Sequence, residues 1–293
     1  MKNSNLNFIF WGTPDVASET LEILKENSFL PSLIITSLDA KKGRGMQLQR
    51  SPVAIFAKEN NIECLKPKKL DSEFTLKLST FNFQLGIVVA YGKILPENIL
   101  YIPKLGSINI HYSLLPKYRG ASPVESAILN GDTETGVTIQ KMIYKMDAGP
   151  IVAQEKVVIY PDETAPELRT RLIKIGGELL VKTLKTPSAS GHSLFAGGEK
   201  QNETEATFCK KIKKEDGLVD LGAELPNVLY NKFRAYVYWP RTFFFKPARN
   251  TSGITDAGGD GKRIIITKAR LEDGKFIIDK IIPESGKEME YKN

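Results

Sequence analysis

The stretch that decides the fold is Ser107-Ile108-Asn109-Ile110-His111, followed by the turn Ser113-Leu114-Leu115-Pro116-Lys117-Tyr118-Arg119-Gly120. Polar residues alternate with isoleucines, and this period of two predicts a β-strand with Ser107, Asn109 and His111 on one face. Because proline and glycine end the strand, the Asn109 amide and the His111 imidazole are expected at its carboxyl end. Ligands of open α/β sheets bind at that end.

A carboxylate completes this candidate site. Residues 136–142 predict another strand, which ends near Met146-Asp147-Ala148-Gly149, so that Asp147 lies in a turn. Its carboxylate can favour a protonated imidazole or position a water. The alternatives are a packing or surface role for His111, one of two histidines in the chain, and a turn-capping role for Asp147.

Strand and helix patterns alternate over the first two thirds of the chain. This alternation predicts an α/β fold with a Rossmann-like, mostly parallel sheet. The strands are expected at residues 6–11, 33–36 and 85–90, and the helices at residues 16–25, 123–129 and 163–185.

The last third has a different pattern. Residues 186–191 and 197–202 are rich in small and polar residues and indicate a linker. Beyond them we expect a helix at residues 225–234 and short strands at residues 242–246, 263–268 and 275–282. The pattern fits a small β-barrel or a sandwich without distinguishing them. We therefore expect a catalytic domain over residues 1–187, a linker over 188–206 and a second domain over 207–293.

Composition narrows the class of protein. A chain of 293 residues with 41% hydrophobic content can bury one large core and a smaller one. Two cysteines, Cys64 and Cys209, are too few for a disulfide framework, and no His or Cys cluster has metal-ligand spacing. No secretory signal and no run of roughly 20 apolar residues is present. We expect a cytoplasmic protein with no metal and no membrane segment.

The net charge of +7 is unevenly distributed. Residues 1–206 hold 24 Lys and Arg against 22 Asp and Glu, a net of +2, whereas residues 207–293 hold 17 against 12, a net of +5. A basic tail is compatible with a polyanionic partner, although a solvated surface gives the same balance. Nucleotide-cofactor motifs are missing, since Gly12-Thr13-Pro14 lacks the spaced glycines of a dinucleotide fingerprint.

The motif from Asn109 to Gly120, with Asp147 downstream, resembles the signature of the folate-dependent formyltransferases. The resemblance implies a catalytic trio of Asn109, His111 and Asp147 and 10-formyltetrahydrofolate as co-substrate, without a metal. Stabilisation of an oxyanion and proton transfer are what such a transfer requires. An amide, an imidazole and a carboxylate supply both.

Other segments are similar to the methionyl-tRNA formyltransferase branch of this family. They are Phe10-Trp11-Gly12-Thr13-Pro14-Asp15, Val88 to Pro96, Gly131 to Thr138, Ala206-Thr207-Phe208 and Ile212 to Gly217. The resemblance implies formyl transfer to the amino group of initiator methionyl-tRNA and an OB-like tail domain used on tRNA. We expect a monomer.

The resemblance also implies where the substrates bind. It places the folate against Ser113, Leu114, Leu115, Pro116, Val88, Val89, Ala90 and Tyr91. Residues 39–50 form a loop that is long for an α/β connection, and its basic residues are expected to contact tRNA, with a solvated mobile loop as the alternative. They are Lys41, Lys42, Arg44 and Arg50.

Alternatives with the same trio are another folate-dependent N-formyltransferase, such as a glycinamide ribonucleotide or sugar-nucleotide enzyme, and a formyltetrahydrofolate hydrolase. An RNA-binding module with an inert α/β platform is the alternative from another class. Tyr238-Trp239-Pro240-Arg241 stands where the family often has Pro-Trp-Pro-Gly. Contacts of the tail to tRNA are therefore left unassigned.

Overall fold

The computed structural model describes residues 6–42, 46–186, 197–246 and 261–292. Arg44 and residues 188–196 of the expected linker lie outside these ranges. The chain divides into two compact units. The first comprises Met1–Gly120, Gly136–Val157 and Thr170–Phe208, and the second comprises Ala121–Thr135, Val158–Arg169 and Cys209–Asn293.

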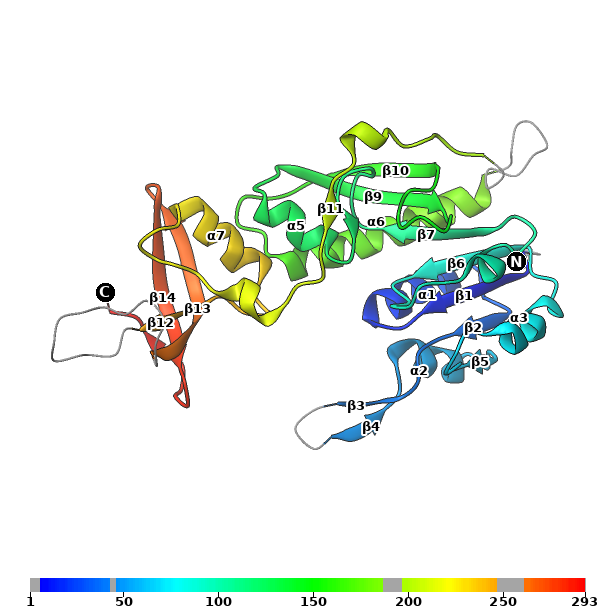
Figure 1. Ribbon diagram of the computed structural model, residues 1–293, viewed down its shortest axis with the longest axis horizontal. Helices are drawn as coiled ribbons and strands as arrows, with labels where there is room; N and C mark the ends of the chain where they lie inside the picture. The colour runs from blue at the N-terminus through cyan, green and yellow to red at the C-terminus, as the bar shows by residue number, and fades with distance from the viewer. Residues whose placement is uncertain (1–5, 43–45, 187–196, 247–260, 293) are drawn as a thin grey trace. The chain divides into compact units, whose positions relative to one another are not determined.

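A seven-stranded sheet organises the first unit (Figure 1), in the order β10-β9-β7-β6-β1-β2-β5. The strands are β1 (Phe8–Gly12), β2 (Leu33–Ile35), β5 (Cys64–Leu65), β6 (Leu85–Val89), β7 (Ser107–His111), β9 (Glu134–Lys141) and β10 (Ile151–Val158). The pairs from β5 to β7 are parallel, and β9 runs antiparallel to β7. The predicted Rossmann-like, mostly parallel sheet is confirmed.

The chain order reverses between β1 and β6, because it runs from β1 to β2 and β5 on one side and to β6 and β7 on the other. This is the switch point at which doubly wound sheets bind ligands. Thr13 Oγ1 donates to the Tyr91 carbonyl at 3.1 Å and joins the two strand ends there.

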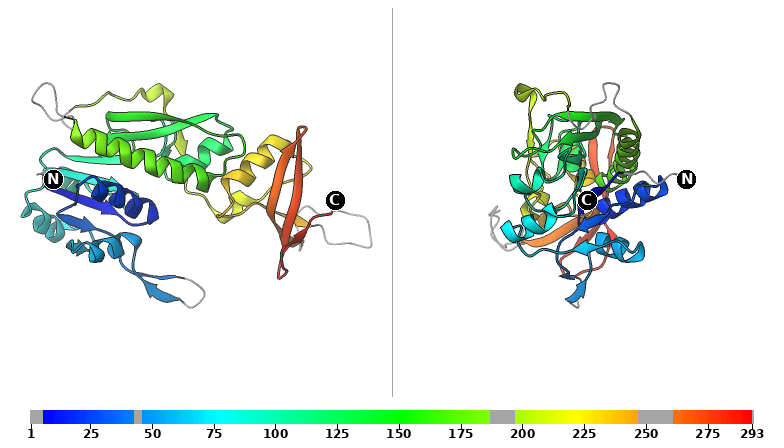
Figure 2. Two further views of the ribbon diagram at one scale, coloured as in Figure 1. Left: turned by 180° about the vertical axis from the view of Figure 1, so that it is seen from behind. Right: turned by 90° about the vertical axis from the view of Figure 1, so that its right-hand side faces the viewer.

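Helices cover both faces of the sheet. Helix α1 (Asp15–Glu26) buries Ala17, Thr20, Leu21 and Leu24, a spacing that gives one apolar stripe. Figure 2 shows α1 beside α6 (Ala165–Lys185), and α6 also packs against β7, since a Cβ on Gly176 would lie 3.2 Å from Ile110. Helices α3 (Ser72–Ser79) and α4 (Glu97–Leu100) contribute to the apolar cluster on the opposite face.

The long connection after β2 is not the loop that the sequence predicted. It carries β3 (Ala40–Lys42) and β4 (Gln47–Gln49), which pair antiparallel. Helix α2 (Pro52–Glu59) follows, capped by the Ser51 hydroxyl, which accepts the Ala54 N–H at 3.1 Å. The antiparallel pairing lets backbone N–H and C=O groups of one strand of the hairpin bond to those of the other.

The second unit contains an antiparallel sheet in the order β12-β13-β14-β15. Its strands are Phe243–Lys246, Lys262–Glu272, Lys275–Pro283 and Met289–Glu290. Asp273 and Gly274 join β13 to β14 with positive φ of 49° and 72°, as a two-residue hairpin turn requires. Helix α7 (Pro226–Ala235) contributes Leu229 to the apolar cluster of this sheet. The arrangement is consistent with the predicted small β domain.

The remaining elements are short. They are α5 (Pro123–Leu129), β8 (Arg119–Gly120), β11 (Phe208–Cys209) and the 3-10 turns Glu203–Glu205 and Lys214–Gly217. Within the described ranges, no helix combines the length and apolar character needed to cross a membrane. The same ranges hold no group of three or more potential metal ligands.

Candidate active site

Strand β7 carries two members of the predicted trio as expected. Ser107 Oγ donates to the Leu100 carbonyl at 3.0 Å, on the α4 face of the sheet, whereas Ile110 packs against α6 on the other. Asn109 therefore faces the same side as Ser107, and its Cα is paired with Val88 of β6 and Gln140 of β9. His111, at the end of the strand, is only 5% exposed.

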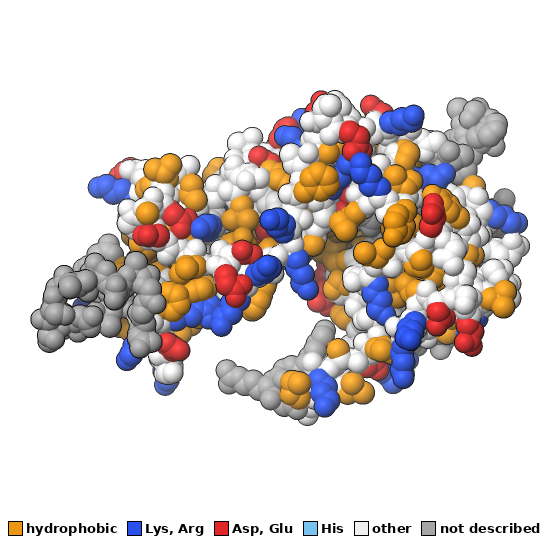
Figure 3. Space-filling view, viewed as in Figure 1, with side chains coloured by type: hydrophobic (Ala, Val, Ile, Leu, Met, Phe, Trp, Pro, Cys, Tyr) orange, Lys and Arg blue, Asp and Glu red, His pale blue; other side chains and the backbone are white. Residues whose placement is uncertain are grey.

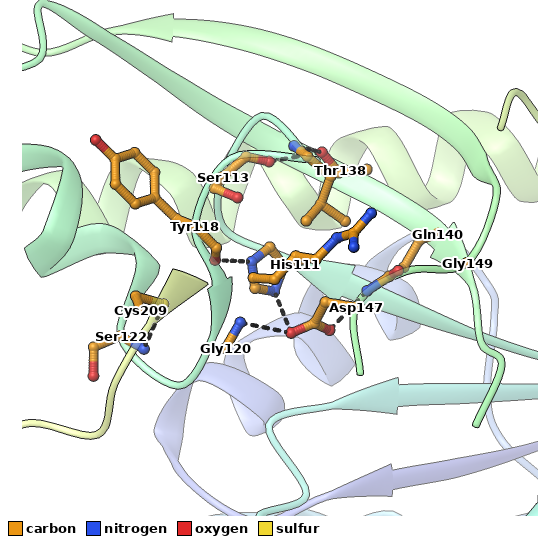
Figure 4. Close-up of polar contacts among 12 residues, drawn as sticks. His111, Ser113, Tyr118, Gly120, Ser122, Thr138, Gln140, Asp147, Gly149 and Cys209 are labelled. Atoms are coloured by element: carbon orange, nitrogen blue, oxygen red, sulfur yellow. Dashed lines mark hydrogen bonds and ion pairs between the residues drawn. The ribbon is translucent and has the colours of Figure 1, made fainter. Parts of the chain in front are cut away.

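The His111 ring is held by one nitrogen. Its Nε2 lies 2.8 Å from the Tyr118 carbonyl oxygen, and because a carbonyl only accepts, Nε2 carries a hydrogen. The other nitrogen, Nδ1, lies 3.7 Å from Asp147 Oδ2, beyond hydrogen-bond distance. Nδ1 is therefore the ring nitrogen that can gain or lose a proton, and Figure 4 shows it facing the carboxylate.

Asp147 is fixed from two directions. Gly120 N–H donates to Oδ2 at 2.8 Å, and Gln140 Nε2 donates to Oδ1 at 2.8 Å. The residue has a positive φ of 49°, a conformation that costs about 1 kcal/mol or more for a residue other than glycine. Such strain at a carboxylate beside a buried histidine is typical of a functional site. The structure thus brings His111 and Asp147 together from segments far apart in the sequence.

The predicted folate residues lie around this group but differ in exposure. Ser113 is fully buried, and its hydroxyl donates to the Lys117 carbonyl at 2.6 Å. Leu115 is 3% exposed, and its N–H donates to Thr138 Oγ1 at 3.2 Å, while Leu114 packs near Gly136. Pro116 is half-buried. The buried side chain of Ser113 and the N–H of Leu115 thus hold the turn in place.

The β6 segment divides in the same way. Val88, Val89 and Tyr91 are buried, whereas Ala90 is exposed with a φ of 47°. The Tyr91 ring packs edge to face on Trp11, with centroids 5.2 Å apart. Burial raises the pKa of Tyr91 to about 12, and its hydroxyl has no hydrogen-bond partner among the described residues. Ala90 is thus the exposed residue of this segment.

Two of the predicted tRNA-binding residues, Lys41 and Lys42, lie on strand β3 of the β3–β4 hairpin. Lys41 is exposed on β3, which ends at Lys42, and Arg50 follows β4, while Arg44 lies outside the described residues. Figure 3 shows basic and hydrophobic side chains together along this hairpin, where Met46 and Leu48 are 60% and 69% exposed.

Sequence reasoning missed the residues that hold Asp147. Gln140 lies on a predicted strand, but nothing in a single strand pattern shows that its amide reaches a later turn. Gln201 donates to the Asp147 carbonyl at 2.9 Å from 54 positions away, within the expected linker. Glu203 accepts from Arg119 and Lys145, and these hydrogen bonds, the one from Arg119 first, lower the pKa of Glu203 to about 2. The sequence offered only the polar run Gln201-Asn202-Glu203, and its spacing does not show that this run contacts the buried Arg119.

Similarity to known proteins agrees with this geometry. The profile of the formyl transferase family matches residues 5–184. A methionyl-tRNA formyltransferase of Thermotoga maritima is 37% identical over 265 residues, covering 89% of this chain and 83% of its own. Its counterpart from Geobacter metallireducens is 38% identical over 241 residues, covering 82% of this chain and 76% of its own.

The chain belongs to the methionyl-tRNA formyltransferase family. Two solved structures share the fold of this family member. A methionyl-tRNA formyltransferase from Clostridium thermocellum matches with a TM-score of 0.61 and 20% identity, over 95% of this chain and 99% of its own. An N-formyltransferase from Helicobacter canadensis matches with a TM-score of 0.64 and 19% identity, over 93% and 98% of the two chains. The folate-dependent formyltransferase resemblance of the sequence is confirmed.

Proposed function

We propose that this enzyme transfers the formyl group of 10-formyltetrahydrofolate to the free amino group of initiator methionyl-tRNA. The observation that carries the proposal is the group formed by Asn109, His111 and Asp147 at the carboxyl end of β7, in a chain whose relatives are named for this activity. Structural neighbours are named as complexes with folinic acid and tetrahydrofolic acid, which supports a folate as the formyl donor.

The co-substrate supplies a formyl carbon bonded to a nitrogen leaving group. We infer that the Asn109 amide donates a hydrogen bond to the formyl oxygen as negative charge develops there. Asn109 fits this role because its side chain makes no hydrogen bond to another described residue. Ala90 and the turn at residues 113–116 would hold the folate, because the small, exposed Ala90 leaves room for a flat ring.

Proton transfer is assigned to His111 and Asp147. The new carbon–nitrogen bond forms at the amino group of the acceptor, which loses a proton, and the folate nitrogen gains one as its bond to the formyl carbon breaks. Nδ1 of His111 can carry that proton because Nε2–H is committed to Tyr118. Asp147 lies 3.7 Å from Nδ1 and can stabilise the protonated imidazole, while the Gly120 N–H and Gln140 Nε2 donate to its two carboxylate oxygens and fix their position.

The proposed domain bounds are those expected from the sequence. Residues 1–187 hold every group assigned above, residues 188–206 connect, and residues 207–293 with the β3–β4 hairpin are proposed to bind tRNA. We also propose a monomer in the cytoplasm. Light scattering of the purified protein checks the monomer, and a stable dimer would contradict it.

One assay tests the function. The purified full chain is given 10-formyltetrahydrofolate with methionyl initiator tRNA, glycinamide ribonucleotide, an amino sugar nucleotide or water alone. Formyl transfer to methionyl-tRNA only is the expected result, and His111→Ala is the matched inactive control. Transfer to another acceptor, or release of formate alone, would replace the proposed function with one of the alternatives from the same family.

A further inference from the structure

Residues 199–207, here named the return strap, run back along the active site after the connecting segment. At one end Glu199 and Ile151 exchange backbone hydrogen bonds of 2.8 and 2.9 Å. At the other end Thr207 Oγ1 accepts the Tyr118 N–H at 2.8 Å, and the Thr207 carbonyl accepts the Arg119 N–H at 2.9 Å. The return strap is therefore tied to the turn after β7 and to the strand that follows Asp147.

Gln201 lies in the middle of the return strap with all its amide groups used. Its Oε1 accepts from Arg119 Nε at 3.0 Å and Nη2 at 2.8 Å. Its Nε2 donates to the carbonyls of Asp147 at 2.9 Å and Gly149 at 2.8 Å. The orientation of this amide is settled, because a guanidinium only donates and a carbonyl only accepts.

Arg119 makes the link to both catalytic groups. Its guanidinium is fully buried, while the neighbouring backbone groups hold the site: the Tyr118 carbonyl binds His111 and the Gly120 N–H binds Asp147. Glu203 accepts from the same guanidinium at 2.9 Å and from Lys145 at 2.8 Å. A displaced Gln201 would leave two buried Arg119 donors without that acceptor, a loss that favours rearrangement.

Asp147 needs this support because its backbone conformation is strained. A residue other than glycine persists at a φ of 49° only where its surroundings determine it. Gln201 fixes the carbonyls on both sides of Ala148, directly after the strained residue. The carboxylate is therefore aimed at His111 by a side chain from the return strap.

We propose that Gln201 is a positioning residue for catalysis, which holds the Asp147 backbone so that its carboxylate meets His111, and that the return strap is part of the active site. The kinetic test of this inference rests on the proposed function, whereas the structural test is independent of that function.

The kinetic test compares Gln201→Ala with Gln84→Ala, a glutamine that accepts the Asn7 N–H at 2.8 Å away from the site. Gln201→Ala should lower kcat by roughly 10-fold to 100-fold, the effect of a displacement of about 1 Å in a catalytic group. KM for both substrates should change less than about twofold, since no substrate contact is removed. Gln84→Ala should leave kcat unchanged.

Gln201→Glu separates positioning from packing. It keeps the side-chain length and an acceptor for Arg119, but it turns a carboxylate oxygen toward the carbonyls of Asp147 and Gly149, where no donor remains. We expect kcat to fall at least as far as in Gln201→Ala, although the ion pair with Arg119 is stronger. If Gln201 only filled space, Gln201→Glu would lower kcat less than Gln201→Ala.

The structural test reads the Gly120 amide proton by NMR. Its hydrogen bond to the Asp147 carboxylate places this resonance downfield, and Asp147→Asn calibrates the shift. Both Gln201 variants should move it upfield. A folded Gln201 variant with wild-type kcat, or with a lowered kcat and an unmoved Gly120 resonance, would overturn the inference. A wild-type protein that formylates no acceptor would overturn only the proposed function, because the Gly120 shift still tests the contact.

Discussion

The two ring nitrogens of His111 have different partners: Nε2 is bonded to the Tyr118 carbonyl, and Nδ1 faces the Asp147 carboxylate. Nε2–H is held by the Tyr118 carbonyl, so the ring cannot present the other tautomer without losing this bond. Nδ1 faces Asp147 at 3.7 Å, far enough to leave its lone pair available to a substrate. Tyr118 itself has a positive φ of 59°, so the surrounding structure has to hold a strained backbone at the His111 partner as well as at Asp147.

The first prediction concerns the trio. Asn109→Ala, His111→Ala and Asp147→Ala should each lower turnover roughly 100-fold or more, because each removes a positioned donor or proton-transfer group. Single-turnover formylation measures the effect. Asp71→Ala is the control, because Asp71 only caps α3 by accepting the Phe74 N–H at 3.1 Å. It should cost about 1 kcal/mol of stability and no turnover. A folded His111→Ala protein of near wild-type activity would rule out the mechanism.

The second prediction concerns pH. Hydrogen bonds from Arg119 and Lys145 lower the pKa of Glu203 to about 2, so its ionised form favours the folded state. A carboxylate whose pKa falls on folding stabilises above its unfolded pKa of about 4.3, and that stabilisation is lost as pH falls toward 2. Glu203→Gln should therefore lower Tm at pH 7, and the difference from wild type should shrink between pH 5 and pH 3. Glu155→Gln, at an exposed position of β10, should show a smaller difference at pH 7.

At the scale of elements, the turn between β9 and β10, which carries Asp147, requires glycine at position 149. A Cβ on Gly149 would lie 1.6 Å from the Lys141 carbonyl oxygen, which is backbone and cannot move aside alone. The third prediction is that Gly149→Ala lowers stability by about 2 kcal/mol or more and lowers kcat as well. Gly197→Ala is the matched control, since nothing lies within 4 Å of the position of its Cβ. Equal melting curves for both variants would contradict the placement of this turn.

The elements also show what periodicity can predict. The strand over 107–111 and the helix over 123–129 agree with β7 and α5 residue for residue, because strict alternation and Pro123 at the helix start are local signals. The β3–β4 hairpin was predicted as a loop, since its strands have three residues each and the side chains of β4 are exposed. Asn109, His111 and Asp147 followed from spacing and resemblance. Gln201 did not, because its partner lies 54 residues away.

The fourth prediction belongs to the hairpin. Arg44 lies between Gly43 and Gly45 in the sequence, where glycines let the backbone bring a cation close to nucleic acid. Arg44→Ala should weaken productive use of methionyl-tRNA and leave folate binding intact. Kinetics at varied tRNA and a folate titration measure the two effects, with Lys58→Ala on α2 as the control. A shifted folate titration with unchanged tRNA kinetics would show that the hairpin has a different role.

At the scale of the whole molecule, each of the two compact units is built from three separate segments of the chain. Residues 121–135 and 158–169 cluster with the tail, and Thr207 supports the turn that holds His111. Removing residues 207–293 would therefore strip partners from the catalytic turn along with the basic tail. A test of what the tail binds has to change its charge in the intact chain.

The last prediction makes that change at a basic cluster in the second unit, where Lys210, Lys211, Lys213 and Lys214 are all exposed. If these lysines neutralise phosphates, replacing all four by alanine should weaken tRNA binding and flatten the dependence of log affinity on log salt. The slope should fall by about 0.9 for each phosphate that the variant no longer neutralises, because fewer counterions are released on binding. Binding of the folate should not change, since its proposed contacts lie before residue 150.

The matched control replaces four exposed lysines of the first unit, Lys58, Lys69, Lys77 and Lys104, and so removes the same charge from the chain. Both proteins must first show a cooperative melt. A net-charge effect alone predicts equal slopes for the two variants, because long-range attraction depends on total charge and is screened beyond about 10 Å at 0.1 M salt. A flatter slope in the tail variant only would identify direct contacts. Equal slopes would show that the basic tail is a solvated surface, and the +5 charge of residues 207–293 would then serve no specific contact.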